Sequence, residues 1–369
     1  MVNKVIIAGA SGLVGSAAVR LFASRRDWEV VAVSRRPPRG VPGSVQHLSV
    51  DLCDEQACAR AFGSMTDVTH LIYAAVSENP DDVFGGWSDP SQVAKNAAML
   101  RNLFEPLGST SRHLRHVALV HGAKAYGPHL PQVKVPVPMR ECLPRVPYPN
   151  FYYDQEDYLR ARQRGQSWSW TVLRPVMIGG VSTGSTLNSF LVLPLFAALC
   201  KEAGLDLPLP DGVGIVADAA DADLIAEALE WAAESPAARN EIFNVANGDA
   251  FALHGGFPVV AECFGLTLGK PRRFDIVAEI RRMDGLWRDM VRRYHLKAPE
   301  DVETLFGGSM QMGGSWSAEA PEGNPLRWGL VSTIKIRQAG FDRCVDSLKM
   351  IRKYARRYQE LGILPLRTD

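Results

Sequence analysis

The chain has 369 residues, of which 46% are hydrophobic, and a formal net charge of +1 at pH 7. One domain usually holds about 100–200 residues, so this length suggests two domains or one large, elaborated domain. The near-neutral charge gives no reason to expect a nucleic acid or an acidic membrane surface as partner. None of the six cysteines forms a C-x-x-C pair, and no histidine pair has a third ligand nearby in sequence, so we expect no metal site.

The N-terminal residues lead directly into an apolar run and lack the basic and apolar regions of a signal peptide. The most apolar stretch, residues 187–200, is too short to span a bilayer and predicts a buried helix. We therefore expect a cytoplasmic protein with no membrane partner.

In the first half of the chain, apolar runs alternate with segments of helical periodicity. The apolar runs predict strands at 4–8, 29–33, 69–74, 117–120 and 170–173, and a further short strand that ends at 50. Helices are predicted between them, at about 13–24, 54–62, 92–104 and 153–164. This alternation is typical of right-handed βαβ crossovers and predicts an α/β protein, an NAD(P)-binding Rossmann fold with a doubly wound parallel sheet.

The second half predicts helices at 187–203 and 222–233 and one more strand at 241–245. From about 251 onward the chain is mainly helical, with a Gly- and Ser-rich loop at 307–317. We expect a Rossmann domain made of residues 1–180 and 214–250. A smaller, mainly helical domain, residues 181–213 and 251–369, would cap the substrate, and the cleft between the two would bind it.

The first predicted strand ends in a glycine-rich turn of the form G-x-x-G-x-x-G at residues 9–15. Glycines let the backbone approach a pyrophosphate, and the N-terminus of the following helix supplies unpaired N–H groups. A glycine-rich turn without a ligand is the alternative. The expected cofactor contacts are Gly9, Ser11, Gly12, Leu13, Val14 and Gly15.

The end of the second strand indicates which dinucleotide binds. An NAD site needs an acidic residue there to hold the ribose 2′-hydroxyl, whereas this chain has Ser34, Arg35 and Arg36. A carboxylate would repel a 2′-phosphate, and a guanidinium pairs with it bidentately. The sequence therefore predicts NADP(H) as cofactor, unless the arginines are merely solvated at a strand end.

Two further segments fit a bound dinucleotide. Asp51 and Leu52 follow the third strand, where a carboxylate can accept a hydrogen bond from the adenine amino group. Ala74 and Ala75 end the fourth strand, where small side chains let the ribose and nicotinamide lie close to the backbone.

The chain lacks the Y-x-x-x-K pair that most short-chain dehydrogenases use. Hydride transfer to a carbonyl or enone builds negative charge on oxygen. A tyrosine whose pKa is lowered by a nearby ammonium can stabilise that charge as a proton donor. In this sequence, however, Glu156 stands four residues after Tyr152, and Asp157 stands four residues after Tyr153.

Two other segments carry a resemblance to a known family. Residues 150–157 read N-F-Y-Y-D-Q-E-D, and residues 122–128 read G-A-K-A-Y-G-P. The chain thus resembles the progesterone 5β-reductase/iridoid synthase family of atypical extended short-chain dehydrogenases. That family carries N-F-Y-Y-x-x-E-D and supplies its lysine from a T-G-x-K-H-Y-x-G-P loop. The resemblance continues at 174–175, 221–227 and 240–249 and covers nearly the whole chain, more loosely beyond about 251.

The resemblance implies that Tyr152 is the catalytic tyrosine and Lys124 the lysine. The family's enzymes transfer a hydride from NADPH to the β-carbon of an enone or enal. The tyrosine stabilises the enolate oxygen, and the lysine stabilises the tyrosine and the nicotinamide ribose, so both residues also contact the cofactor. Tyr153 is the rival candidate, but neighbours on a helix point about 100° apart, so only one can face the nicotinamide.

The resemblance also implies a carboxamide contact from the segment after the sixth strand, through Pro175, Met177 and Ile178. The chain departs from the family at His121, where the family has Thr, and at Ala125, where it has His. The loop between the lysine and the tyrosine is also shorter. These changes bear on the substrate and leave the predicted fold and cofactor as they are.

We therefore expect an NADPH-dependent enzyme that reduces enones or enals, with a small molecule as its partner. The first alternative is a carbonyl reductase or alcohol dehydrogenase that uses the same tyrosine and lysine for 1,2-chemistry, with a ketone as a possible substrate. The second is a non-enzymatic NADP-sensing protein on the same fold. The habits of the wider superfamily suggest a homodimer.

Overall fold

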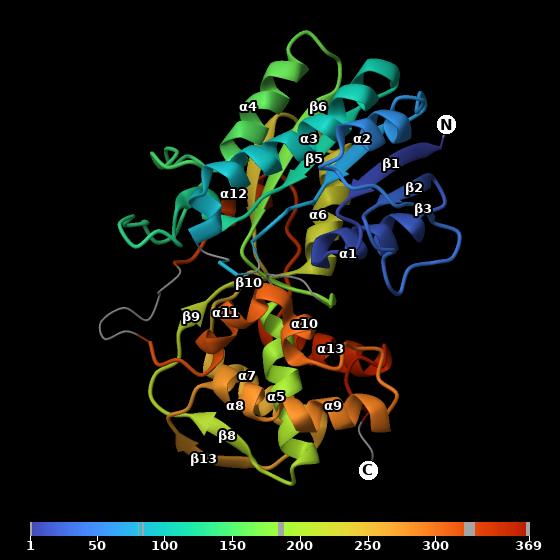
Figure 1. Cartoon of the computed structure of the whole chain (residues 1–369). Helices are drawn as coiled ribbons and strands as arrows, with labels where there is room; N and C mark the ends of the chain where they lie inside the picture. The colour runs from blue at the N-terminus through green and yellow to red at the C-terminus, as the bar shows by residue number, and fades with distance from the viewer. Residues whose placement is uncertain (1, 80, 83–84, 184–187, 321–328, 367–369) are drawn as a thin grey trace. The chain divides into compact units, whose positions relative to one another are not determined.

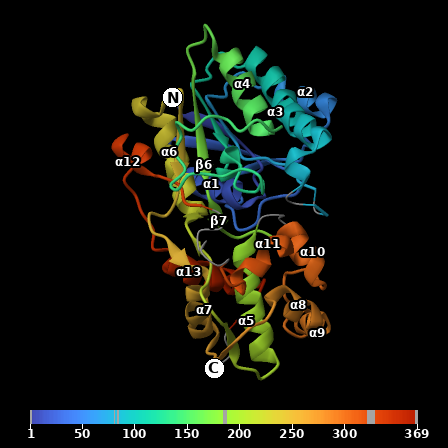
Figure 2. The same ribbon diagram turned by 90° about the vertical axis from the view of Figure 1, so that its left-hand side faces the viewer.

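The computed structural model describes residues 2–79, 81–82, 85–183, 188–320 and 329–366. The chain forms two compact units, which are described separately below (Figures 1 and 2). The first unit comprises Met1–Val176, Ala222–Val245 and Val331–Arg343. The second comprises Met177–Asp221, Ala246–Leu330 and Cys344–Asp369.

The first unit is built on a seven-stranded sheet in which every neighbouring pair of strands is parallel. The strand order is β3-β2-β1-β4-β5-β6-β11, so the chain turns from one side of β1 to the other when it passes to β4. This confirms the predicted Rossmann fold, whose ligands bind where the strand order reverses. The strands are β1 (Asn3–Ala8), β2 (Trp28–Val33), β3 (Gln46–Leu48), β4 (His70–Tyr73), β5 (His116–Val120), β6 (Ser169–Pro175) and β11 (Glu241–Val245).

Helices cover both faces of this sheet. Helices α2 (Glu55–Phe62), α3 (Pro90–Thr110) and α4 (Phe151–Gln163) lie on one face, while α1 (Leu13–Ala23) and α6 (Ala222–Glu234) lie on the other (Figure 2). All seven residues of β6 are buried, as a strand covered on both faces requires.

The first unit also contains a late segment of the chain, 331–343, that the sequence assigned to the helical domain. Its helix α12 (Ile334–Gln338) packs against β11. Lys335 Nζ lies 2.7 Å from Glu241 Oε2 and donates a hydrogen bond to the Ile242 carbonyl at 2.9 Å. These contacts hold the segment to the edge strand.

The described part of the second unit is mainly helical and contains three short strand pairs. Its strands pair as β7 (Met177–Gly179) with β10 (Ala219–Asp221), β9 (Val216–Ala217) with β12 (Phe251–Ala252), and β8 (Leu207–Pro210) with β13 (Leu268–Arg272). Its longer helices are α5 (Val192–Glu202), α7 (Gly256–Phe264), α8 (Ile276–Arg282), α9 (Asp284–Arg293), α10 (Val302–Phe306) and α13 (Ser347–Glu360).

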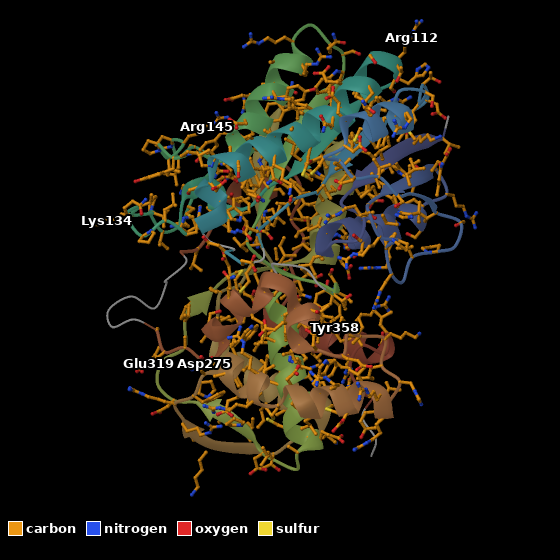
Figure 3. The ribbon with its side chains drawn as sticks, viewed as in Figure 1. Arg112, Lys134, Arg145, Asp275, Glu319 and Tyr358 are labelled. Carbon is orange, nitrogen blue, oxygen red and sulfur yellow. The ribbon has the colours of Figure 1, made fainter. Side chains whose placement is uncertain are left out.

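The apolar stretch predicted as a buried helix is α5, in which every residue from Val192 to Cys200 is buried. Residue 187, where the predicted helix began, lies outside the described residues. Tyr358 of α13, labelled in Figure 3, is fully buried in this unit, and its hydroxyl donates to the Gly180 carbonyl at 2.7 Å. None of the helices in the described ranges has the length and apolar character needed to cross a bilayer.

The prediction of a Gly- and Ser-rich loop at 307–317 was wrong. The segment forms η6 (Gly307–Ser309), α11 (Met310–Gly313) and η7 (Gly314–Trp316), which are short helical turns. The reason is burial, because Met310 and Trp316 are 4% and 1% exposed within the core of this unit. Trp316 Nε1 also donates to the Ser189 carbonyl at 2.8 Å, so the turns are anchored despite their composition.

Candidate active site

The glycine-rich turn packs directly on the end of β4. Gly9 has φ +81°, and a Cβ there would lie 2.5 Å from the Ala74 carbonyl oxygen and 2.8 Å from the Ala75 nitrogen. A Cβ at Gly15 would lie 2.1 Å from the Gly9 carbonyl oxygen. Both positions therefore require glycine, and the structure brings the predicted loop and the predicted alanines together.

The turn leads into α1, whose N-terminus begins at Leu13. Gly12 is the N-cap, and no side chain caps this end. Leu13, Val14 and Gly15 thus form a first helical turn of backbone N–H groups, the arrangement that binds phosphate.

The predicted 2′-phosphate residues lie beside the glycine turn. The N–H groups of Gly9 and Ala10 both donate to the Val33 carbonyl, at 3.0 and 3.1 Å, so the end of β2 is fixed next to the turn. Ser34 Oγ donates to the Arg36 carbonyl at 2.6 Å and shapes the chain there. The side chains of Arg35 and Arg36 are exposed at this edge.

The residues after β3 are placed differently from each other. Asp51 is exposed, and its Oδ1 accepts the Cys53 N–H at 3.0 Å. Leu52 is buried, and its carbonyl accepts a hydrogen bond from Asn102 Nδ2 at 2.9 Å. Only the exposed Asp51 carboxylate is therefore available to a ligand through its side chain.

The tyrosine helix and the lysine loop are tied together by one asparagine. Asn150 is the N-cap of α4, and its Oδ1 accepts the Tyr152 N–H at 3.0 Å. Its Nδ2 donates to the carbonyl of Lys124 at 3.1 Å. Lys124 lies in the short helix η2 (Ala123–Tyr126), just beyond β5. The two sequence motifs thus form one structural unit.

Tyr152 is buried among rings. Its ring stacks on His121 with centroids 4.1 Å apart and an interplanar angle of 15°, and meets Trp87 edge-on at 5.0 Å. Its hydroxyl lies 3.4 Å from the position of a Cβ at Gly122, so a side chain there would crowd it. Burial raises the pKa of Tyr152, with Glu78 adding to the effect and Arg174 opposing it, so the hydroxyl remains a proton donor.

Lys124 also contacts Trp87. Its Nζ stands 3.9 Å from the Trp87 ring centroid and 3.8 Å from Glu78 Oε1. Burial lowers the pKa of Lys124 to about 8, although the Glu78 carboxylate opposes this shift. Tyr152 and Lys124 therefore belong to one cluster in which both contact Trp87.

Glu78 and Trp87 are site residues that the sequence analysis missed. Trp87 Nε1 donates to Glu78 Oε1 at 3.1 Å, and burial raises the pKa of Glu78 while Lys124 opposes the rise. One signal was available, because Glu78 follows β4 closely and residues just beyond the carboxyl ends of parallel strands face the ligand crevice. Trp87 had no such signal.

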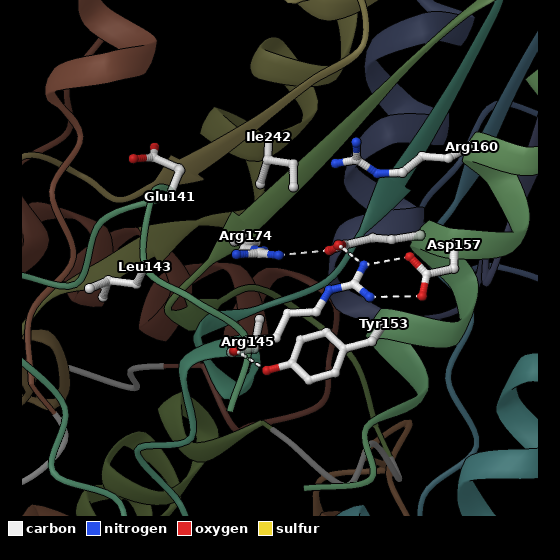
Figure 4. A pocket seen from close by; sticks show the side chains of 10 residues that line it. Glu141, Leu143, Arg145, Tyr153, Asp157, Arg160, Arg174 and Ile242 are labelled. Atoms are coloured by element: carbon white, nitrogen blue, oxygen red, sulfur yellow. Dashed lines mark hydrogen bonds and ion pairs between the residues drawn. The ribbon is translucent and has the colours of Figure 1, made fainter. Parts of the chain in front are cut away.

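Tyr153 points elsewhere, as the helical geometry predicted. Its hydroxyl donates to the Ala125 carbonyl at 2.6 Å and accepts the Val146 N–H at 3.1 Å, so it holds the loop before α4. It also lines a pocket of about 340 Å³ (Figure 4). In this pocket Arg145 binds Asp157, and Arg174 binds Glu156.

A family model described as the PRISE-like Rossmann-fold domain matches residues 53–310. The chain belongs to this family. The matched range begins after the glycine turn, so the turn itself is supported by the fold and its own geometry.

The chain is similar to enzymes of at least two named types. An (S)-8-oxocitronellyl enol synthase from Nepeta racemosa is 34% identical over 84% of this chain and 82% of the relative. A 3-oxo-Δ(4,5)-steroid 5-beta-reductase from Arabidopsis thaliana is 30% identical over 79% of this chain and 78% of the relative. These likenesses confirm the predictions that the chain is a member of this family and an oxidoreductase.

Solved structures show the same fold in more distant proteins. A UDP-glucose 4-epimerase from Thermotoga maritima has a TM-score of 0.65 and 16% identity, and covers 97% of this chain and 99% of that one. A UDP-glucose 4-epimerase from Thermus thermophilus, in complex with NAD, has a TM-score of 0.64 and 20% identity, with 96% and 99% covered. At such identities the likeness extends to the fold alone.

Glu156, the glutamate of the N-F-Y-Y-x-x-E-D motif, pairs with buried side chains. Burial alone would raise the pKa of Glu156, but His121 and Arg174 outweigh it and lower that pKa. Glu156 Oε1 lies 2.7 Å from Arg174 and 3.4 Å from His121 Nδ1. His121, which replaces the family's Thr, is thereby held against Tyr152.

The remaining predicted contacts fall in different units. Pro175 ends β6, and its carbonyl oxygen lies 3.4 Å from the position of a Cβ at Gly122. Met177 and Ile178 belong to the second unit, where β7 pairs them with Ala219 and Ala220. Their contact with a cofactor stays a prediction.

Proposed function

We propose that this PRISE-family chain is an NADPH-dependent reductase that acts on the β-carbon of an enone or enal. The observation that carries the proposal is the cluster of Tyr152, Trp87 and Lys124, which joins a buried phenol and an ammonium through one indole. Both motif residues lie beyond the carboxyl ends of the parallel strands, at the edge of the sheet where the glycine turn also lies.

The cofactor proposal rests on the edge formed by β1, β2 and β4. Gly9 and Gly15 have no space for a Cβ, and the uncapped start of α1 offers N–H groups to a pyrophosphate. Arg35 and Arg36 are exposed at the place where an NAD enzyme carries a carboxylate, which supports NADP(H). Bound there, NADPH supplies the hydride.

The chain's own residues would then stabilise the negative charge that develops on the substrate oxygen. The Tyr152 hydroxyl, kept protonated by burial, would donate a hydrogen bond to the carbonyl oxygen, where negative charge develops as the β-carbon is reduced. The Lys124 ammonium would stabilise that charge and bind the ribose hydroxyls. The stack with His121 fixes the ring plane of Tyr152 before the substrate arrives.

The preference for 1,4-reduction is supported by the names of the relatives. A 3-oxo-Δ(4,5)-steroid 5-beta-reductase is named for an enone and for reduction at the carbon β to the oxo group. Reduction of the carbonyl carbon, with Tyr152 protonating the oxygen, is the second reaction that this cluster could support.

The test is product analysis with NADPH deuterated at the transferable position. The purified chain is incubated with a panel of enones, enals and ketones, and the position of the label is read by NMR. We expect deuterium on the β-carbon of a saturated carbonyl product. Label on the carbinol carbon would instead indicate a carbonyl reductase, and NADPH that stays unoxidised with every acceptor would favour a sensor.

A further inference from the structure

Glu78 is a buried carboxylate that belongs to none of the motifs. Its side chain is 3% exposed, and its Oε1 accepts the Trp87 indole N–H at 3.1 Å and stands 3.8 Å from Lys124 Nζ. The Lys124 ammonium also lies over the face of the same indole, at 3.9 Å. Glu78, Trp87 and Lys124 therefore form a closed set of contacts beside Tyr152.

The backbone that presents Glu78 is fixed by helix α3. The Ser77 N–H donates to Asn96 Oδ1 at 2.8 Å, and Asn96 Nδ2 donates to the Ser77 carbonyl at 2.8 Å. Gln92 Nε2 also bonds to that carbonyl. Asn96 is fully buried, and its own carbonyl accepts Gln155 Nε2 from α4 at 2.9 Å. Glu78 is thus held in place by the helix that follows it and, through Asn96, is linked to the tyrosine helix.

A buried ion pair of this kind is poorly explained by stability. Desolvating both charges offsets most of their attraction, so an apolar pair of similar volume is often as stable. A carboxylate beside an ammonium does, however, keep that ammonium charged where burial would neutralise it. Among the other titratable groups in the described residues, His129 is close enough for the Lys124 charge to act on it, and Tyr152 contacts the same indole as Lys124. Arg174 acts on Tyr152, and His121 stacks on it.

We propose that Glu78 is a positioning residue that holds the Lys124 ammonium charged against Trp87, ready to serve Tyr152 and the cofactor. This inference rests on the proposed role of Lys124 in the reaction. Burial lowers the pKa of Lys124 to about 8 even with Glu78 opposing the shift, so loss of the carboxylate lowers it further. The cation is then lost from the site at neutral pH.

The test is Glu78→Gln, which keeps an oxygen for the Trp87 N–H and removes the charge. The titration of Lys124 is followed by NMR of the intact chain with ¹³C-labelled lysine, its signal assigned by its loss in Lys124→Met. We expect the Lys124 midpoint to fall by about 1–3 pH units, the usual effect of an opposite charge at this distance. The alkaline limb of kcat/KM should move down by the same amount.

The matched control is Glu105→Gln, an exposed carboxylate of α3 that pairs with Arg162 and should leave both midpoints unchanged. An unchanged Lys124 midpoint in Glu78→Gln overturns the inference. A shifted midpoint with an unmoved pH profile also overturns it, because the charge on Lys124 then does not serve the reaction. The NMR titration needs no turnover, so failure of the proposed reduction itself is recognised separately.

A second variant covers the case in which Glu78→Gln does not fold. Glu78→Asp keeps the charge on a shorter side chain, farther from Lys124 Nζ. The Lys124 midpoint should then fall by a smaller amount in the same direction. No change in this variant counts against the inference as well.

Discussion

Tyr152 and Tyr153 adjoin on one helix and differ only in what surrounds them. The Tyr153 hydroxyl makes two hydrogen bonds: it donates to the Ala125 carbonyl and accepts from the Val146 N–H. Tyr152 is held by ring contacts with His121 and Trp87, which fix the plane of its ring. Its proposed role assigns the hydroxyl to the substrate. The proposed choice of Tyr152 over Tyr153 therefore rests on what surrounds each side chain.

We expect the preference for NADPH over NADH to depend on single residues as well. Each charge-assisted contact to a phosphate contributes about 1.5–3 kcal/mol, or more than about tenfold in affinity. We expect Arg36→Ala to weaken NADPH binding by that factor and to leave NADH binding nearly unchanged, as measured by calorimetric titration. Arg26→Ala, which removes an exposed arginine from the opposite end of β2, is the control. Equal affinity of the wild-type chain for NADPH and NADH would contradict the assignment of Arg36 to the 2′-phosphate.

The lysine gives a pH dependence with a definite sign. The pKa of Lys124 is lowered to about 8, chiefly by burial, so the ammonium is present below that pH and lost above it. We expect NADPH affinity and turnover to decline together as the pH rises through about 8. Lys124→Met should bind NADPH weakly at every pH and show no such decline. A wild-type enzyme with unchanged NADPH affinity from pH 7 to 9.5 would contradict this role of the lysine.

At the scale of elements, two neighbouring strands carry a pair of buried histidines. His70 of β4 is opposite His116 of β5 in the register, and both are buried. Burial lowers the pKa of His70 to about 4 and that of His116 to about 3, helped by nearby positive charges. Both rings are therefore neutral in the folded chain above about pH 4, while both take up protons near pH 6.5 when the chain unfolds.

This pair predicts acid sensitivity. Between about pH 6.5 and 4 the unfolded chain binds more protons, so the free energy of unfolding falls as the pH falls, by up to about 1.4 kcal/mol per pH unit for each histidine. Urea unfolding at a series of pH values measures this slope. His116→Leu should reduce it by about one histidine's share, whereas His113→Leu, at an exposed position, should not. A wild-type slope near zero over this range would refute the argument.

Most elements could be predicted because each is encoded locally. All strands of the sheet except β3 contain a short apolar run. The glycine turn is required at Gly9 by a positive φ and at Gly15 by the lack of space. The segment 307–317 was mispredicted because its composition favours a loop, while burial of Met310 and Trp316 decides its structure. Burial of that kind depends on residues far away in the sequence.

The same limit applies to the candidate site. Tyr152 and Lys124 could be proposed because they lie in motifs, and Arg36 because it lies at a strand end, and their roles stay predictions. Glu78 and Trp87 lie in a segment without periodicity, and only the folded chain brings them to Lys124. Sequence motifs indicate the groups that we propose to act, whereas the contacts of the proposed positioning residue could be found only in the folded chain.

At the scale of the whole molecule, a shared fold does not imply a shared reaction. Two UDP-glucose 4-epimerases share this fold at 16% and 20% identity, while the relatives at 30–34% identity are named as a reductase and an enol synthase. A common fold hosts many reactions, so the chemistry must be argued from the site.

The habits of the superfamily lead us to expect a homodimer. Sedimentation over a range of concentrations should give a species of twice the 40.5 kDa chain mass. A single species near 40.5 kDa at every concentration would show that the chain acts as a monomer.

The central claim is that Tyr152 supplies the hydrogen bond on which reduction by this chain depends. Its most direct test is the rate of NADPH oxidation by Tyr152→Phe, with an acceptor that the wild-type chain reduces and with Tyr153→Phe as the matched control. Loss of a donor aimed at a developing oxyanion costs about 2.7–4 kcal/mol, so turnover by Tyr152→Phe should fall roughly 10²–10³-fold while NADPH affinity is kept. Tyr153→Phe should be less stable and remain active. Full activity in Tyr152→Phe, with or without loss of activity in Tyr153→Phe, would contradict the account.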